Sequence, residues 1–298
     1  MGLTIVIRSY NEMPHVPATL NNLLIQRRQD FGVIVIDTGS TDGSVEVFKE
    51  FAQGPGKKYN FELIEIPVEE YNPGRVLNMG IGKSPHDIVV LLNADATPVD
   101  EFWLERLVEP FAQDEEIAAT FSRVLPRDDT KPLVVADIER FFPEKGELPK
   151  WKHYVHYSHI SNAIRKKCWE EHPVTTACKM TCEDAEWGLW ALQKGYRIQY
   201  VPASLVYHAH NYTLGRYYRR MFREGEDSVQ VFRDARPGML RGLKSFAGAV
   251  LRDVAWCVRR GHILSALYSP ILRITQQIAR YRGQRRGIRA RSREMNVT

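Results

Sequence analysis

The stretch Ile88-Val-Val-Leu-Leu-Asn-Ala-Asp-Ala-Thr-Pro98 is an apolar run that stops at a short polar cluster containing Asp95. Its five consecutive Ile, Val and Leu residues predict a strand buried on both faces, as in the centre of a parallel sheet. Asp95 then follows the carboxyl end of that strand. Open α/β sheets bind ligands at this edge, where a carboxylate can hold a divalent cation or a ribose. An Asp here could equally begin a turn or cap the next helix, so the rest of the chain must decide.

The composition predicts an ordinary globular protein. The chain has 298 residues, of which 44% are hydrophobic and 26% are charged, so it can bury a full core and is neither disordered nor fibrous. The four cysteines have spacings that fit neither a zinc pair nor a secreted disulfide framework, which favours reduced thiols. The N-terminus leads directly into a strand without a basic region and an apolar run, so we expect a cytoplasmic location.

Charge is distributed unevenly along the chain. From Arg241 onward there are 13 Lys and Arg against 2 Asp and Glu, a balance of +11, while residues 1–240 have a balance of −6. A basic segment of this kind can face nucleic acid, an anionic membrane surface or only solvent.

The N-terminal half predicts a doubly wound α/β sheet. Residues 3–7 and 33–36 are short apolar runs, and each is followed by a polar loop and an amphipathic helical pattern, at 16–26 and 44–51. Asp37 ends the second run, so it also lies at the carboxyl edge. Neither G-x-G-x-x-G nor G-x-x-x-x-G-K-[ST] occurs, which removes the main support for NAD binding or a P-loop.

A third strand, residues 61–66, precedes a helix opened by Pro73. Arg75 at the start of this helix could pair with a phosphate or with a structural carboxylate.

These motifs resemble the nucleotide-sugar half of the inverting family 2 glycosyltransferases, which have the GT-A fold. The resemblance rests on four segments and extends from residue 3 to about residue 215, and within the family it is strongest to bacterial rhamnosyltransferase-like enzymes. The segments are Ile5-Val-Ile-Arg-Ser-Tyr-Asn-Glu12, Val35-Ile-Asp-Thr-Gly-Ser-Thr-Asp-Gly43, Asn72-Pro-Gly-Arg-Val-Leu-Asn78 and Asn93-Ala-Asp-Ala-Thr-Pro98.

The resemblance implies a donor site and a divalent metal, Mn²⁺ or Mg²⁺. The chain departs from the family in two places: Thr38 replaces the second Asp of the usual Asp-Asp-Gly-Ser loop, and Asn93 replaces the first Asp of the usual Asp-x-Asp metal motif. A single carboxylate binds these cations more weakly than two do, so the strength of metal dependence has to be measured. The donor-binding residues implied by the resemblance are Arg8, Tyr10, Glu12, Asp37, Arg75, Asn93 and Asp95.

The second half is expected to bind the acceptor. A helix over 101–111 and a strand over 117–121 are followed by residues 126–150, which predict a mobile connection. His153, His156 and His159 then recur every three residues with tyrosines between them, which favours a loop near the acceptor over a metal site. Residues 161–165 resemble the strand that lines the active site in this family, with Asn162 as an acceptor contact.

Glu183 and Asp184 open the helix that follows. In an arbitrary helix they would only be favourable charges in the first turn. Because Glu-Asp followed by Trp187 matches the acceptor-side motif of the family, the resemblance assigns Asp184 as the general base, Glu183 as the group that orients the acceptor, and Trp187 as an acceptor contact.

Two short strands, 197–201 and 204–208, lead to His208-Ala-His210. Both imidazoles could share one face. The resemblance suggests His208 as a metal ligand with Asp95, and His210 as a reserve ligand or acceptor contact. The alternative is that both histidines only form hydrogen bonds within the loop.

From residue 214 the chain is helical and basic, without a run of about 18 apolar residues that could span a bilayer. Residues 239–293 could contact an anionic membrane peripherally, close to a lipid-linked acceptor, or could pack on the catalytic domain. We expect 280–293 to be frayed, and no module for nucleic-acid binding is present. The expected domains are 1–215, divided near 125, and a helical extension over 216–298.

The resulting prediction is an inverting glycosyltransferase of cell-envelope polysaccharide synthesis. It would move a sugar from a nucleoside-diphosphate donor, with thymidine-diphosphate rhamnose suggested by resemblance alone, to a saccharide or lipid-linked acceptor. Two alternatives are a sugar-nucleotide nucleotidyltransferase, which the glycine-free Arg8-Ser-Tyr-Asn-Glu12 loop disfavours, and a non-catalytic binding protein, which Asn93 leaves open and the Glu183-Asp184 pair disfavours.

Overall fold

The computed structural model describes residues 2–145, 148, 150–151, 154–232 and 238–295. The chain divides into two compact units. Unit 1 comprises residues 1–127, 140–176 and 183–208, and unit 2 comprises residues 128–139, 177–182 and 209–298. The predicted domain boundaries near 125 and 215 stay a prediction.

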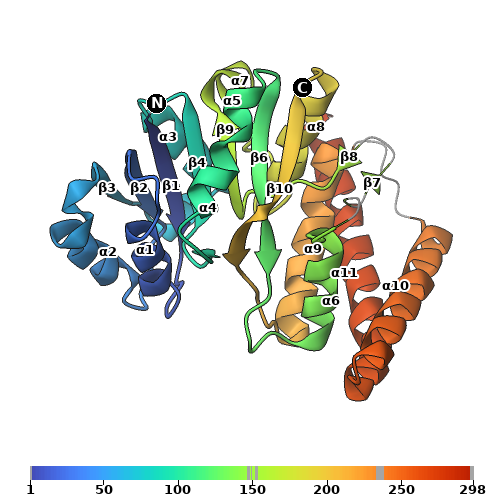
Figure 1. The fold of residues 1–298 in the computed structure, drawn as a ribbon. Helices are drawn as coiled ribbons and strands as arrows, with labels where there is room; N and C mark the ends of the chain where they lie inside the picture. Colours follow the sequence, from blue (N-terminus) through green and yellow to red (C-terminus); the bar gives the residue numbers. More distant parts are fainter. Residues whose placement is uncertain (1, 146–147, 149, 152–153, 233–237, 296–298) are drawn as a thin grey trace. The chain divides into compact units, whose positions relative to one another are not determined.

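Unit 1 is built on a mixed eight-stranded sheet of order β3-β2-β1-β4-β9-β6-β10-β5 (Figure 1). Strands β3, β2, β1 and β4 are mutually parallel, β6 and β10 are parallel, and β9 and β5 run antiparallel to their neighbours. The bounds are β1 Leu3–Ser9, β2 Phe31–Asp37, β3 Phe61–Glu65, β4 Ile88–Asn93, β5 Thr97–Pro98, β6 Ile117–Leu125, β9 Ser161–Arg165 and β10 Arg197–Tyr207. A separate two-stranded sheet pairs β7 Lys150–Trp151 with β8 Tyr154–Val155.

The predicted central strand is confirmed. The five apolar residues of β4 are all buried, and β4 lies between β1 and β9. Helices and strands alternate as predicted through α3, and Gly80 of α3 allows close packing on β1, since a Cβ at Gly80 would lie 2.3 Å from Val6 Cγ1. The helices of this unit are α1 Val16–Leu24, α2 Ser44–Gln53, η1 Pro55–Lys58, η2 Val68–Glu70, α3 Pro73–Lys83, α4 Trp103–Val108, α5 Pro110–Gln113, α7 Lys166–Glu171 and α8 Glu183–Gln193.

Three local predictions are wrong. Residues 126–150 are not only a connection, because α6 Pro132–Phe141 forms within them with Leu133 buried. Residues 197–208 form one strand, β10, whose register to β6 shifts between Val201 and Leu205, so Pro202 interrupts the pairing without ending the strand. The segment 280–293 is helical rather than frayed.

Unit 2 is a helical assembly of the first part of α6 with α9 Leu214–Val231, α10 Met239–Arg259 and α11 Ile263–Met295. Glycines allow α9 and α11 to approach closely, because a Cβ at Gly283 would lie 1.9 Å from the carbonyl oxygen of Phe222. A buried ion-pair network also holds the unit together: Arg273 Nε lies 2.7 Å from Asp253 Oδ2, and its Nη2 lies 2.9 Å from Asp137 Oδ1. Among the described residues, no helix is both long enough and apolar enough to cross a bilayer.

Candidate active site

Polar residues gather at the carboxyl edge of the parallel strands. In the sheet register Arg8 is opposite Asn93 on β4, and Ser9 is opposite Asp37 on β2. Asp95 follows β4 directly and is 2% exposed. The position of these residues at one sheet edge is as predicted, because parallel strands present their carboxyl ends together.

Arg8 links this edge to the first turn of α8. Its Nε donates to Asn93 Oδ1 at 2.6 Å, and its Nη1 lies 3.0 Å from Glu183 Oε1. Burial is the largest single influence and lowers the pKa of Arg8. The charge and hydrogen bond of Glu183, together with the charges of Tyr71 and Asp184, outweigh burial, so the pKa of this guanidinium group is raised. Asn93, which replaces an Asp of the metal motif, accepts a hydrogen bond from Arg8. Its side chain thereby orients the guanidinium group of Arg8.

Asp184 has the properties of a general base. Burial and the neighbouring charge of Glu183 raise its pKa to about 7, while hydrogen bonds from the backbone N–H groups of Ala185 and His159 act in the opposite direction. A carboxylate with a pKa near the working pH both accepts a proton readily and is deprotonated for a large fraction of the time. The partly buried carboxyl of Asp184 therefore suits proton abstraction from a hydroxyl group.

Asp95 and His208 form the centre of a candidate metal site. His208 Nε2 lies 3.4 Å from Asp95 Oδ2, and both residues are buried. Burial, followed by the charges of Asp95 and Asp42, raises the pKa of Glu12 to about 8. The carboxyl groups around Asp95 thus repel one another, and an imidazole nitrogen with carboxylate oxygens is a donor set that fits Mn²⁺ or Mg²⁺.

Other predicted donor residues have local partners. Asp37 is fully buried and accepts hydrogen bonds from the Ser40 backbone N–H at 2.8 Å and from Ser40 Oγ at 2.7 Å, which closes the loop after β2. Tyr10 directly follows β1 and is exposed. Arg75 is half-exposed and its Nη2 lies 2.7 Å from Glu70 Oε2. Their donor-binding roles stay predictions.

The predicted acceptor residues lie in different environments. Asn162 is fully buried, and its Nδ2 donates to the Tyr157 hydroxyl at 2.8 Å. Trp187 is also fully buried, with its indole N–H 2.9 Å from the His172 carbonyl oxygen, so it packs within the core of unit 1. His210 follows His208 by two residues and belongs to unit 2. These acceptor roles stay predictions.

Sequence reasoning missed one residue of this region. Arg127 Nη2 donates to the main-chain carbonyl oxygen of Asp95, and its charge lowers the pKa of Glu12. Arg127 comes two residues after β6. The carboxyl end of a parallel strand is the signal that could have identified it.

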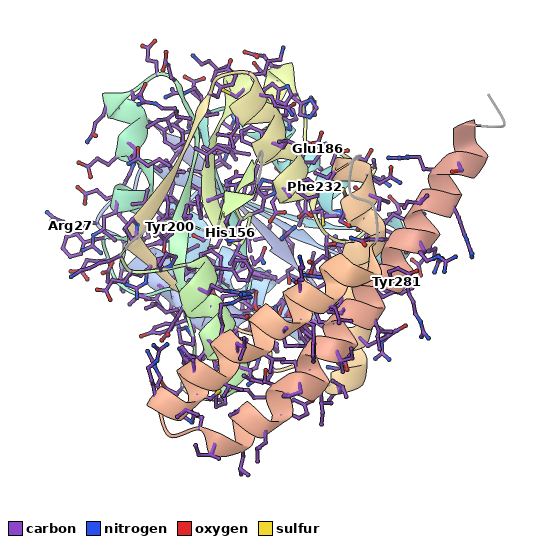
Figure 2. The ribbon with its side chains drawn as sticks, turned by 90° about the vertical axis from the view of Figure 1, so that its right-hand side faces the viewer. Arg27, His156, Glu186, Tyr200, Phe232 and Tyr281 are labelled. Atoms are coloured by element: carbon purple, nitrogen blue, oxygen red, sulfur yellow. The ribbon has the colours of Figure 1, made fainter. Side chains whose placement is uncertain are left out.

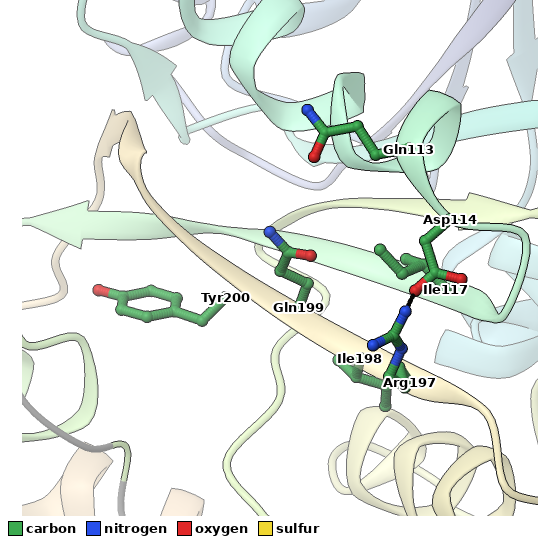
Figure 3. A pocket seen from close by; sticks show the side chains of 7 residues that line it. All are labelled: Gln113, Asp114, Ile117, Arg197, Ile198, Gln199 and Tyr200. Atoms are coloured by element: carbon green, nitrogen blue, oxygen red, sulfur yellow. Dashed lines mark ion pairs between the residues drawn. The ribbon is translucent and has the colours of Figure 1, made fainter.

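A cleft of about 500 Å³ occupies another part of unit 1 (Figure 3). It is lined by Gln113, Asp114 and residues of the amino ends of β6 and β10, where Arg197 forms an ion pair with Asp114. Since β6 and β10 are parallel, this cleft lies at the sheet edge opposite to their carboxyl ends. None of the predicted site residues lines it.

The fold is that of the GT-A class of glycosyltransferases. The sequence model of glycosyl transferase family 2 matches residues 4–173, more than half of the chain, and the chain belongs to this family. The predicted family and enzyme class are confirmed.

Curated relatives cover most of the chain. It is 27% identical over 262 residues to the O-antigen chain rhamnosyltransferase RfbN of Salmonella typhimurium, across 85% of this chain and 79% of that protein. It is 27% identical over 237 residues to the O-antigen chain rhamnosyltransferase WbaN of Salmonella anatum, across 77% of this chain and 71% of that protein.

Solved structures share the fold. The mannosyltransferase PcManGT from Pyrobaculum calidifontis, in complex with GDP-Man and Mn²⁺, superposes with a TM-score of 0.65 at 20% identity, over 96% of this chain and 86% of that one. S. aureus TarS 1–349 in complex with UDP-GlcNAc gives a TM-score of 0.52 at 14% identity, over 96% and 91% of the two chains. At these identities the likeness establishes the GT-A fold, as predicted.

Proposed function

We propose that this glycosyltransferase moves a sugar from a nucleoside-diphosphate sugar to a hydroxyl group of a saccharide or lipid-linked acceptor, with inversion at the anomeric carbon. The observation that carries the proposal is the pair of contacts of Arg8. Its guanidinium joins Asn93, at the sheet edge where the donor is expected, to Glu183, which is adjacent to the candidate base. These contacts support a site in which the donor would lie beside the base.

In this proposal Asp184 takes the proton of the acceptor hydroxyl while the oxygen attacks the anomeric carbon. The bond from this carbon to the diphosphate breaks in the same step, so the nucleoside diphosphate leaves from the opposite face of the sugar. Glu183 orients the acceptor and is itself fixed by Arg8. Asp95 and His208 would hold Mn²⁺ or Mg²⁺, which supplies positive charge for the departing diphosphate.

The donor sugar is proposed to be rhamnose, supplied as thymidine-diphosphate rhamnose. Two relatives that cover most of this chain are named O-antigen chain rhamnosyltransferases. Their names also support a place in the synthesis of a cell-envelope polysaccharide. Pocket contacts decide sugar specificity, so the identity of the donor has to be measured.

Unit 2 is proposed to contact an anionic membrane surface. In α11 the buried positions carry small or charged residues such as Ala266, Ser269 and Gly283, whereas larger apolar side chains are exposed at spacings of three and four. This distribution is the reverse of that expected for a helix in water. The exposed stripe comprises Leu264, Leu267, Ile271, Ile274, Ile278 and Tyr281, of which Tyr281 is labelled in Figure 2.

Basic side chains accompany this stripe. Lys244, Arg252 and Arg259 are exposed on α10, and Arg285 and Arg289 are exposed on α11. Exposed aliphatic groups with Lys and Arg beside them are the combination that binds the interface of an anionic bilayer.

The function is tested by nucleoside-diphosphate release from a panel of nucleotide-sugars, with Mn²⁺, with Mg²⁺ and with a chelator. We expect release from one donor, dependent on metal and acceptor, and lost in Asp95→Ala and Asp184→Asn. Asp30→Asn, which changes an exposed carboxylate of the Arg28 ion pair, is the matched control and should keep full activity.

Two results would overturn the proposal. Pyrophosphate formation from a sugar 1-phosphate and a nucleoside triphosphate would identify a nucleotidyltransferase. Binding of donors without turnover, in the presence of a broad acceptor mixture, would identify a binding protein.

A further inference from the structure

His159 lies between the donor edge and the candidate base. It belongs to the loop that precedes β9, and its backbone N–H donates to the carboxylate of Asp184. The next residue, Ile160, accepts a hydrogen bond from the Asn93 backbone N–H at 2.9 Å through its carbonyl oxygen. The main chain at His159 and Ile160 is therefore hydrogen-bonded to Asp184 and Asn93, two residues of the candidate site.

The imidazole of His159 is buried with unused hydrogen-bonding capacity. Its exposed fraction is 1%, and neither ring nitrogen has a hydrogen-bond partner among the described residues. The ring packs edge-on against Tyr157, with 5.1 Å between centroids. Asn162, which donates to the same tyrosine, likewise has no partner for its Oδ1 within the described part of the chain. Buried polar groups are normally paired, so these atoms indicate a ligand with matching groups.

The chemistry of the imidazole selects the kind of ligand. Burial, assisted by the positive charge of Arg8, lowers the pKa of His159 to about 3, so the ring is neutral. A neutral imidazole offers one N–H donor and one nitrogen acceptor. A hydroxyl group is also both donor and acceptor, so it can pair with either ring nitrogen, whereas an ionised phosphate only accepts hydrogen bonds and can pair only with the N–H.

We propose that His159 is a specificity-determining contact that hydrogen-bonds to a hydroxyl group of a sugar ring bound beside Asp184. This inference rests on the proposed transferase function and deepens it. The sugar can be that of the donor or that of the acceptor, and both offer the same chemistry.

The test combines a side-chain change with removal of single hydroxyl groups from the substrate. Wild type and His159→Phe are compared with thymidine-diphosphate rhamnose and its 2-, 3- and 4-deoxy analogues, and then with octyl hexosides and their monodeoxy forms as acceptors. In wild type, loss of the contacted hydroxyl should lower kcat/KM about 5- to 50-fold, because a buried imidazole is left unpaired. In His159→Phe the same deletion should cost less than about 2-fold.

Two further variants separate this effect from loss of folding. His159→Gln keeps a donor and an acceptor and should restore part of the discrimination. His86→Phe changes a histidine whose Nδ1 pairs with Thr4 Oγ1 at the amino end of β1, at the opposite sheet edge, and should leave the discrimination unchanged.

The affected hydroxyl group belongs either to the donor or to the acceptor, and this identifies which of the two sugars His159 contacts. Equal penalties in wild type and His159→Phe for every deoxy compound would overturn the inference and leave the transferase function intact. Absence of sugar transfer by wild type with every donor would overturn the proposed function, and the inference with it.

Discussion

At the level of single residues, the proposed role of Asp184 as the base makes activity depend on pH. In that role its carboxyl group must be ionised, and its pKa is raised to about 7 by burial and by Glu183. We therefore predict that kcat/KM rises with pH up to an apparent pKa near 7. In Glu183→Gln the like charge is removed, so the acid limb should move down by about 1 pH unit. A pH–rate profile of both proteins measures this, and an unmoved limb would contradict it.

The same carboxyl group should make the folded state less stable at high pH. Its pKa of about 7 in the folded protein exceeds the ordinary 3.8, so the folded state binds the proton more tightly than the unfolded chain does. The contribution of Asp184 to the free energy of unfolding is then fully present below about pH 4 and is lost as the pH rises through about 7. We predict that Asp184→Asn is more stable than wild type at pH 8, by on the order of 2 kcal/mol, and equally stable near pH 4. Urea unfolding at both pH values measures the difference, and equal values at pH 8 would refute it.

A cation held by Asp95 and His208 should stabilise the fold. Ligands that bind only the folded state raise its stability in proportion to RT ln(1 + [L]/Kd). We predict that Mn²⁺ raises the melting temperature of wild type. The rise should be abolished in Asp95→Ala and reduced in His208→Ala, because each variant loses one of the two central ligands. Calorimetry without substrate gives this result independently of activity. His86→Ala serves as the control, because the Nδ1 atom of His86 pairs with Thr4 Oγ1 at the amino end of β1, at the sheet edge opposite to Asp95.

The role of Asn93 shows how far sequence could go at this scale. Its position at the sheet edge was predictable, because an uninterrupted apolar run fixed β4 and hence the residue at its end. Its partner was not predictable. The contact to Arg8 spans 85 positions in the chain, and only the parallel register of β1 and β4 brings the two together.

At the level of elements, glycines determine how α9 and α11 pack. A Cβ at Gly283 would meet the Phe222 carbonyl oxygen, whereas a Cβ at Gly242 in α10 would lie 3.9 Å from Gln277 Oε1. Gly283→Ala should therefore lower the free energy of unfolding by about 1–3 kcal/mol through overpacking. Gly242→Ala should raise it by about 0.5–1 kcal/mol through helix propensity. Chemical denaturation compares the two, and a neutral Gly283→Ala would mean that the helices are further apart.

The two helical segments that sequence reasoning missed have different causes. The helix α6 has Val134, Ile138 and Phe141 at helical spacing, but prolines and charged residues on both sides of it favour a connection. The last turns of α11, by contrast, bury Gly283 and Gly287 and lack an apolar stripe. Hydrophobic periodicity detects helices that bury large apolar side chains. Where packing relies on glycine contacts or buried ion pairs, the pattern is weak and tertiary contacts decide.

At the level of the whole molecule, the exposed apolar stripe of α11 predicts membrane binding that depends on both charge and apolar contact. Wild type should bind vesicles containing 30% phosphatidylglycerol at low salt, and binding should weaken with added salt because basic side chains contribute. Leu264→Asp with Leu267→Asp should reduce partitioning at least about 10-fold, since two aliphatic side chains no longer enter the interface. Ile25→Asp, at an exposed aliphatic residue of unit 1, is the control and should bind as wild type does. Vesicle sedimentation measures membrane binding, and light scattering of the protein without vesicles measures its oligomeric state. A dimer in solution that the Leu264 and Leu267 changes dissociate, with no vesicle binding, would show instead that a second copy of the chain covers this stripe.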